Sequence, residues 1–190
     1  MMGSWSRAGY HIQHNEQLLG AVQIELYCGD GRAAWDLLTR HWPALVRSQL
    51  LRIQIIRVCM WSLRARAALA AAATADDPTR LLRSAARDAR RLAREGVPWS
   101  VAHARFIQGL LAAARGAHDE AAVRLDEAAA RFEAADMRLC AAAARARRGG
   151  LPGRVADRAL VADAHAWMAD QGIRNPARMA AMYAPAVNAD

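Results

Sequence analysis

The 190-residue sequence contains no lysine, and all 26 of its basic residues are arginine. A Walker-type phosphate loop needs a lysine on the β- and γ-phosphates, a protein kinase needs one on the α- and β-phosphates, and a Schiff-base enzyme needs an amine. The chain alone cannot supply these groups, so we expect no enzymatic activity and no cofactor. Arginine-only usage also fits a GC-rich coding sequence, so it is weak evidence for bidentate arginine contacts.

Aromatic residues are also scarce, at 6% of the chain, and β-branched residues are few outside residues 53–58. Alanine supplies about a quarter of the sequence, a composition that favours helix throughout. We therefore expect an all-α protein without a sheet. A chain of this length forms one domain with a continuous core.

Cysteines are few and odd in number: Cys28, Cys59 and Cys140 lie far apart in the sequence. The first residues have no apolar segment of the kind found in a secretory signal. The most apolar stretch, residues 50–75, is interrupted by four arginines, so it is predicted to be a buried helix and not a membrane span. These features predict a reduced, cytoplasmic protein that does not enter a membrane.

Chemistry-bearing side chains form no recognisable active-site pattern. The spacing of His11, His14 and Cys28 matches no closed zinc site and lacks a fourth ligand, so we expect no metal. Serines are few, and no Gly-x-Ser-x-Gly nucleophile elbow occurs, which makes hydrolase chemistry improbable. The tryptophans at 35, 61, 99 and 167 are expected to pack in the core.

Residues 110–137 predict a helical hairpin. Gly116 ends the first helix, and apolar residues then recur at alternating steps of four and three, which places them on one narrow face of the second helix. That face consists of Ala121, Leu125, Ala128, Phe132 and Ala135. The offsets of Gly116, Ala121 and Leu125 recur earlier in the chain at Gly29, Ala34 and Leu38. We interpret this recurrence as a weak structural repeat.

Periodicity and turn residues together predict about nine helices, with short connections that make successive helices antiparallel. The expected helices cover residues 13–28, 32–41, 49–73, 78–95, 99–115, 118–134, 139–148 and 155–171, with a short last helix after Pro176. Trp42 and Pro43 are expected to end the second helix. The predicted fold is a right-handed α-solenoid of about four hairpins, similar to tetratricopeptide repeats. Residues 1–148 would form the hairpins, 149–153 a Gly/Pro hinge, and 154–190 capping helices of the same domain.

One polar stripe is a candidate binding site. Its residues are Gln54, Arg57 and Arg64 on one predicted helix and Arg105 and Gln108 on another. First-arm helices line the inner groove of tetratricopeptide solenoids, so these side chains are candidates for contacting an acidic peptide or ligand. Ordinary solvent exposure is the alternative interpretation of the same stripe.

A second candidate is a basic stripe on the helix predicted at 78–95. It consists of Arg80, Arg83, Arg87, Arg90, Arg91 and Arg94, opposite an apolar face. Such a stripe suits a phosphate backbone, which makes nucleic-acid binding an alternative function. No aromatic residues interleave with these arginines, however, and any exposed solenoid helix shows a charged stripe of this kind.

Five segments, taken in order, resemble the C-terminal tetratricopeptide-like repeat region of large bacterial serine/threonine protein kinases. They are WPALVRSQLLRIQIIRV, LRARAALAAAA, AREGVPWSVAHARFIQGLLAAARG, LDEAAARFEAADMRLCAAAARARRGG and AWMADQGIRNPARMAAMYAP. In those kinases a kinase domain is followed by an ATPase module and then by the repeats. The resemblance covers nearly the whole chain from Gly9 onward.

The resemblance implies a sensory or regulatory arm that binds a protein partner or peptide, with no catalytic residues of its own. The glycine-rich loop, catalytic aspartate and Walker lysine of the kinases are absent from this chain. A truncated kinase-family fragment is therefore a further interpretation, and a complete short protein is another. In a truncated module an uncapped first hairpin would favour homo-oligomers.

Overall fold

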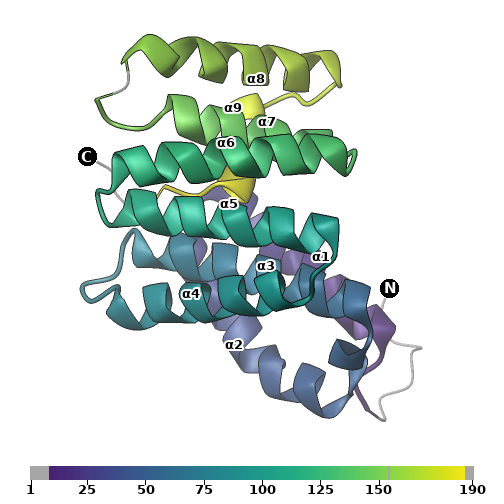
Figure 1. Cartoon of the computed structure of the whole chain (residues 1–190). Coiled ribbons are helices and arrows are strands. Elements are labelled where there is room, and N and C mark those ends of the chain that lie inside the picture. The colour runs from purple at the N-terminus through teal and green to yellow at the C-terminus, as the bar shows by residue number, and fades with distance from the viewer. Residues whose placement is uncertain (1–8, 154, 187–190) are drawn as a thin grey trace.

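The computed structural model describes residues 9–153 and 155–186, and within them all regular structure is helical (Figure 1). The all-α prediction is therefore confirmed for the described residues. The α-helices are α1 (Ile12–Cys28), α2 (Gly31–Arg47), α3 (Gln54–Ala72), α4 (Thr79–Arg94), α5 (Pro98–Ala114), α6 (His118–Ala134), α7 (Arg138–Gly149), α8 (Ala159–Asp170) and α9 (Pro176–Tyr183). Two short 3₁₀ helices, η1 (Leu50–Arg52) and η2 (Val155–Arg158), precede α3 and α8.

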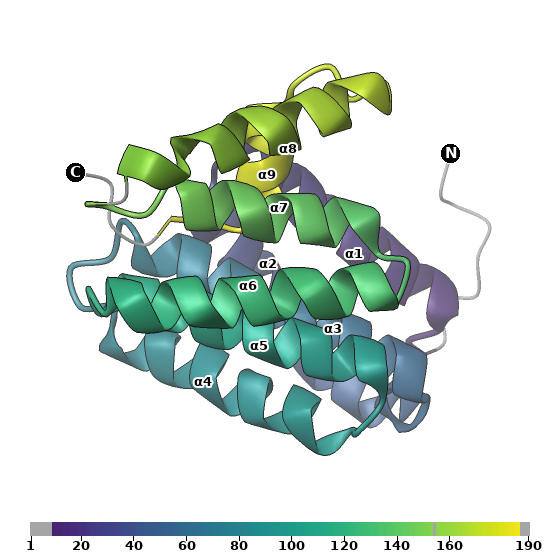
Figure 2. The same ribbon diagram turned by 45° about the horizontal axis from the view of Figure 1, so that its top comes forward.

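The helices pack in the order in which they occur in the chain. Each helix from α1 to α8 contacts the next one, and α3 also contacts both α1 and α5. The last helix, α9, departs from this order: it lies against α1 and α7 as well as α8 (Figures 1 and 2). The C-terminal helix therefore returns to the start of the series.

The same tight turn recurs between helices. Gly29 and Gly116 have φ of +87° and +74°, and in each turn the following amide donates to a carbonyl five residues back. These bonds run from Asp30 N to Glu25 O at 2.9 Å and from Ala117 N to Ala112 O at 3.0 Å, the pattern of a Schellman turn. The next helix begins two residues after each glycine.

A third turn of this kind lies between α6 and α7, where the sequence has no glycine. Asp136 has φ +55°, and the Met137 amide donates to the Phe132 carbonyl at 2.8 Å. Aspartate is one of the few residues that tolerate this left-handed backbone. A search for glycine in the sequence therefore does not detect this turn, although its geometry between α6 and α7 is the same.

The positions that follow each turn are core positions. Ala34 and Leu38 on α2, and Ala121, Leu125 and Phe132 on α6, are all fully buried. Phe132 packs edge-on against Phe106 of α5, with 5.7 Å between ring centroids. Alanine at the first of these positions allows the neighbouring helix to approach closely, and the large ring fills the wider space further along.

The prediction that Trp42 and Pro43 end the second helix is wrong, because α2 continues through Pro43 to Arg47. A proline inside a helix removes one N–H donor. Continuing the helix places Leu45 in the core, where it is completely buried. Burial of this leucine offsets part of the cost of the proline.

The segment around 149–153 connects α7 to η2 and α8. Gly149 is the last residue of α7, and a Cβ on it would lie 2.7 Å from the Asp157 carbonyl oxygen. Leu151 is buried in the largest core cluster. In the described residues, no helix combines the length and apolar character that a membrane crossing requires.

Candidate functional site

The polar residues of α3 turn toward α4. Arg57 and Arg64 are separated by two helical turns and therefore share a face of α3. Arg57 binds Glu95 through Nε and Nη2, each 2.7 Å from a carboxylate oxygen. Arg64 binds Asp88 in the same bidentate way, at 2.7 Å and 2.5 Å. Gln54 joins the first pair by donating to Glu95 at 3.0 Å.

The two ion pairs differ in burial. Asp88 is completely buried and Arg64 is 14% exposed, whereas Arg57 is 23% exposed. Hydrogen bonding by Arg57 lowers the pKa of the Glu95 carboxyl, and the same bond raises the pKa of Arg57. The Arg57–Glu95 pair therefore favours the charged form of both of its groups.

Indole rings lie against the same arginines. The Arg64 guanidinium stands 3.7 Å from the centroid of the Trp42 ring, which belongs to α2. Arg57 and Arg91 lie 5.7 Å and 5.6 Å from the Trp61 ring. These distances fall within the range of cation–π attraction. Arg64 is thus held by a carboxylate on one side and by an aromatic ring on the other.

A hollow of about 240 Å³ opens beside Arg64, between α2, α3 and α4. We call it the arginine–tryptophan site, and its lining residues are Trp35, Thr39, Trp42, Pro43, Arg64, Arg80, Ser84 and Arg87. Arg80 and Arg87 are exposed, and neither forms an ion pair with another described residue. The site therefore combines two indole rings with two unpaired guanidinium groups.

The five residues that the sequence singles out fall into two groups. Gln54, Arg57 and Arg64 meet the carboxylates of α4, as above. Arg105 and Gln108 on α5 bind each other, with 3.2 Å between Nη1 and Oε1, and Arg105 also approaches Glu127 of α6 at 3.4 Å. All five side chains thus have a charged partner within the chain, and of the five only Arg64 lines the hollow.

Sequence reasoning missed the residues that complete the arginine–tryptophan site. The sequence predicts Trp42 at the end of a helix, and Asp88 is one carboxylate within an arginine-rich helix. No aromatic residue interleaves with the basic stripe in the sequence, yet folding brings Trp35 and Trp42 of α2 beside Arg80 and Arg87 of α4. The available signal was the pair of tryptophans at i and i+7 on one face of α2.

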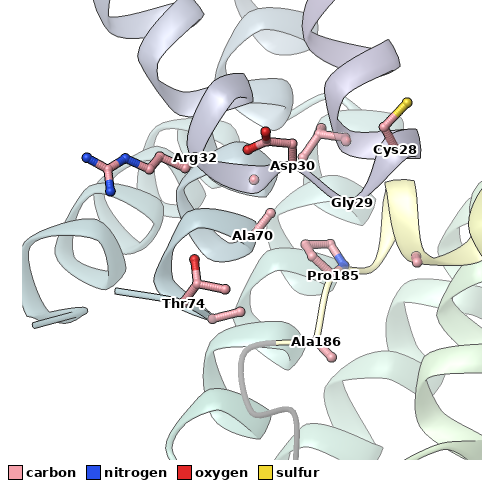
Figure 3. A pocket seen from close by; sticks show the side chains of 12 residues that line it. Cys28, Gly29, Asp30, Arg32, Ala70, Thr74, Pro185 and Ala186 are labelled. Atoms are coloured by element: carbon pink, nitrogen blue, oxygen red, sulfur yellow. The ribbon is translucent and has the colours of Figure 1, made fainter. Parts of the chain in front are cut away.

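A second hollow, of about 450 Å³, lies at the α1–α2 turn beside the end of α3 and the segment after α9 (Figure 3). Glycine and alanine contribute much of its lining. The Asp30 carboxylate is already used as the N-cap of α2, since it accepts from Ala33 N at 2.8 Å. The Arg32 side chain extends away from Pro185 and Ala186 in this view. The hollow therefore lacks converging polar groups that would select a ligand.

Among the residues that the structure describes, no three histidine, cysteine or carboxylate side chains converge as a metal site would require. Comparison with known proteins adds no assignment: no family model, curated protein or solved structure matches the chain. The candidate site therefore depends on its own geometry and charge.

Proposed function

We propose that the chain is a non-catalytic protein-interaction scaffold that binds an acidic segment of a partner protein at the arginine–tryptophan site. The observation that carries this proposal is the position of Arg80 and Arg87, which line a hollow together with Trp35 and Trp42 and form no ion pair with another described residue. Arginine and tryptophan are enriched among the residues that dominate binding energy at protein interfaces.

The size of the hollow favours a side chain over a free small molecule. Pockets for small ligands commonly measure roughly 300–1,000 Å³, and this one holds about 240 Å³. We expect a leucine or aromatic side chain of a partner to enter the hollow beside the two indole rings. Neighbouring carboxylates on the same partner would pair with Arg80 and Arg87, since the guanidinium fork matches a carboxylate.

The site is also organised before any partner arrives. Asp88 and the Trp42 ring together fix the Arg64 side chain, which lies 14% exposed at the base of the hollow. A side chain that is already ordered loses little conformational freedom on binding. This supports a recognition role for the site, in addition to its contribution to stability.

The surrounding fold supports a scaffold. The two-residue Schellman turns, the contacts of α3 with both α1 and α5, and the buried alanines after each turn favour a right-handed, tetratricopeptide-like solenoid. The resemblance to the repeat arm of bacterial signalling kinases supports a sensory or regulatory role in the cytoplasm. In that setting the partner would be another signalling protein or an upstream module.

The test uses a fluorescent peptide of alternating glutamate and leucine and its glutamine counterpart, titrated with the full chain and followed by anisotropy. We expect only the glutamate peptide to bind, and Arg80→Gln or Arg87→Gln to weaken binding roughly tenfold, the effect of losing a charge-assisted hydrogen bond. Arg83→Gln is the matched control, because Arg83 is exposed on the same helix but does not line the hollow. Equal losses in all three variants would contradict the proposed site.

Nucleic-acid binding is a second candidate, favoured by one observation. Arg80 and Arg87 of the basic stripe line the same hollow as Trp35 and Trp42, and aromatic rings next to basic residues suit single-stranded nucleic acid. A single-stranded oligonucleotide would then bind with a steep dependence on salt, and Arg83→Gln, Arg87→Gln and Arg90→Gln would weaken it alike. A flat salt response would exclude this candidate.

A further inference from the structure

Arg66 of α3 is a buried cation without a carboxylate partner among the residues that the structure describes. Arg64 precedes it by two residues, so the two side chains lie on opposite sides of α3. Arg66 is only 6% exposed. Nη1 donates to the Met182 carbonyl at 3.3 Å, the Tyr183 ring lies 4.9 Å away, and Nε has no hydrogen-bond partner within 9–153 and 155–186. Burial lowers the pKa of the Arg66 guanidinium. Tyr183, Cys140 and Cys59 act electrostatically in the opposite direction.

Both contacts of Arg66 belong to α9, the helix that departs from the serial packing. Met182 packs in the core cluster of α1, α2 and α3, whereas Ala180 packs with α7 and α8. Tyr183 is packed against all three core clusters. We call the surface of α1 and α7 that α9 covers, together with Arg66 of α3, the α9 site (Figure 2).

The structure of α9 depends on this site. The helix has eight residues, and an isolated helix shorter than roughly 12 residues is marginal in water. Its N-terminus is capped locally by Asn175, which accepts from Arg178 N at 3.0 Å. No described residue of α9 forms an ion pair with the rest of the described chain. Apolar packing and the two contacts to Arg66 therefore hold α9 in place.

We propose that the α9 site is a helix-binding site that α9 occupies within the chain, and that the amphipathic helix of a partner displaces α9 by placing a carboxylate where Tyr183 now lies. A buried charge is costly unless it is paired. An acidic side chain at this position supplies the counter-charge that α9 lacks. The exchange gives up the packing of the Tyr183 ring and gains a charge-assisted bond to Arg66, while a partner helix still offers a backbone carbonyl at the Met182 position.

The binding test uses two fluorescent peptides that span residues 175–185, one with the natural sequence and one with Tyr183→Glu. Each is titrated into the full chain carrying Ala180→Arg, which displaces α9 because Ala180 is buried, or Ala181→Arg, a control at the neighbouring exposed alanine. We expect the glutamate peptide to bind the Ala180→Arg chain at least tenfold more tightly than the natural peptide. We expect it to bind the control chain more weakly, because α9 competes there.

Equal affinity of the two peptides for the Ala180→Arg chain, or no binding to it, would overturn the proposal. Arg87→Gln added to the same chain should leave binding unchanged, which separates this result from that of the arginine–tryptophan site. A second measurement avoids the risk that Ala180→Arg unfolds the chain: Tyr183→Glu should melt at a higher temperature than Tyr183→Gln in the otherwise natural protein. An equal or lower melting temperature for the glutamate variant would also overturn the proposal.

Discussion

Arginine in this protein acts in three different settings, according to its partner. Arg57 and Arg64 bind buried or half-buried carboxylates, Arg66 is buried without one, and Arg80 and Arg87 are exposed and unpaired among the described residues. The sequence shows all of these as members of similar arginine-rich helices. The setting of each one is fixed by residues on other helices, so it emerges only on folding.

The ion pair of Arg64 with Asp88 is expected to contribute to stability. Asp88 also accepts from Arg91 Nη1 at 3.2 Å. Asp88→Asn therefore leaves Arg64 and Arg91 facing a neutral, buried amide, and removing one partner of a buried pair costs about 3 kcal/mol. Urea unfolding measures this loss. Glu133→Gln is the control: its pair with Arg145 is over 40% exposed on both sides, so the change should stay within about 1 kcal/mol. Equal effects of the two variants would show that burial of Asp88 is unimportant.

His103 gives the protein a predictable response to acid. Burial lowers its pKa from 6.5 to about 3, and its Nδ1 lies 3.1 Å from the Ser62 hydroxyl. Below pH 6.5 the unfolded chain binds a proton that the folded chain excludes until about pH 3. The free energy of unfolding therefore falls as pH decreases through this window, by about 1.4 kcal/mol per pH unit from this group.

Urea unfolding at pH 7 and pH 5 measures this response. The free energy of unfolding of the natural chain should fall by roughly 2 kcal/mol more than that of His103→Gln over this range. Carboxylate contributions are common to both chains and cancel in the difference. If the two chains lose stability in parallel, His103 is not excluded from protonation in the folded state.

At the scale of the helices, the sequence predicts well where local signals agree with packing. The helix predicted at 118–134 matches α6, because a glycine turn and a regular apolar face both mark it. The helix predicted at 32–41 is shorter than α2, which continues through Pro43 to Arg47. Burial of Leu45 favours this continuation more than the proline opposes it. The predictions 49–73 and 155–171 each merge a 3₁₀ helix with the α-helix that follows it.

The Schellman turn that recurs between helices predicts opposite changes in melting temperature for substitutions at residues 116 and 136. Asp136 adopts the left-handed backbone that glycine adopts at residue 116, with φ of +55° and +74°. That backbone costs a non-glycine residue about 1 kcal/mol. Asp136→Gly should therefore raise the melting temperature, and Gly116→Ala should lower it. Thermal unfolding followed by circular dichroism measures both, and a loss of stability in Asp136→Gly would contradict the shared geometry.

At the scale of the whole molecule, α9 packs back against α1 at the start of the helix series. The sequence does not predict this packing. Periodicity identifies α9 as a short amphipathic helix, but it contains no information on which distant surface that helix covers. The arginine–tryptophan site has the same character, because it joins α2, α3 and α4. Fold class is readable from local pattern, whereas sites formed between helices depend on long-range packing.

The most direct test of the proposed function is the indole N–H spectrum of the ¹⁵N-labelled chain during titration with the glutamate–leucine peptide. Each tryptophan gives one signal, which single Trp→Phe variants assign. We predict that the signals of Trp35 and Trp42 shift with the peptide concentration while those of Trp99 and Trp167 stay in place. Shifts at Trp99 or Trp167 with none at Trp35 and Trp42, or no shift at any tryptophan, would contradict recognition of an acidic partner at this surface.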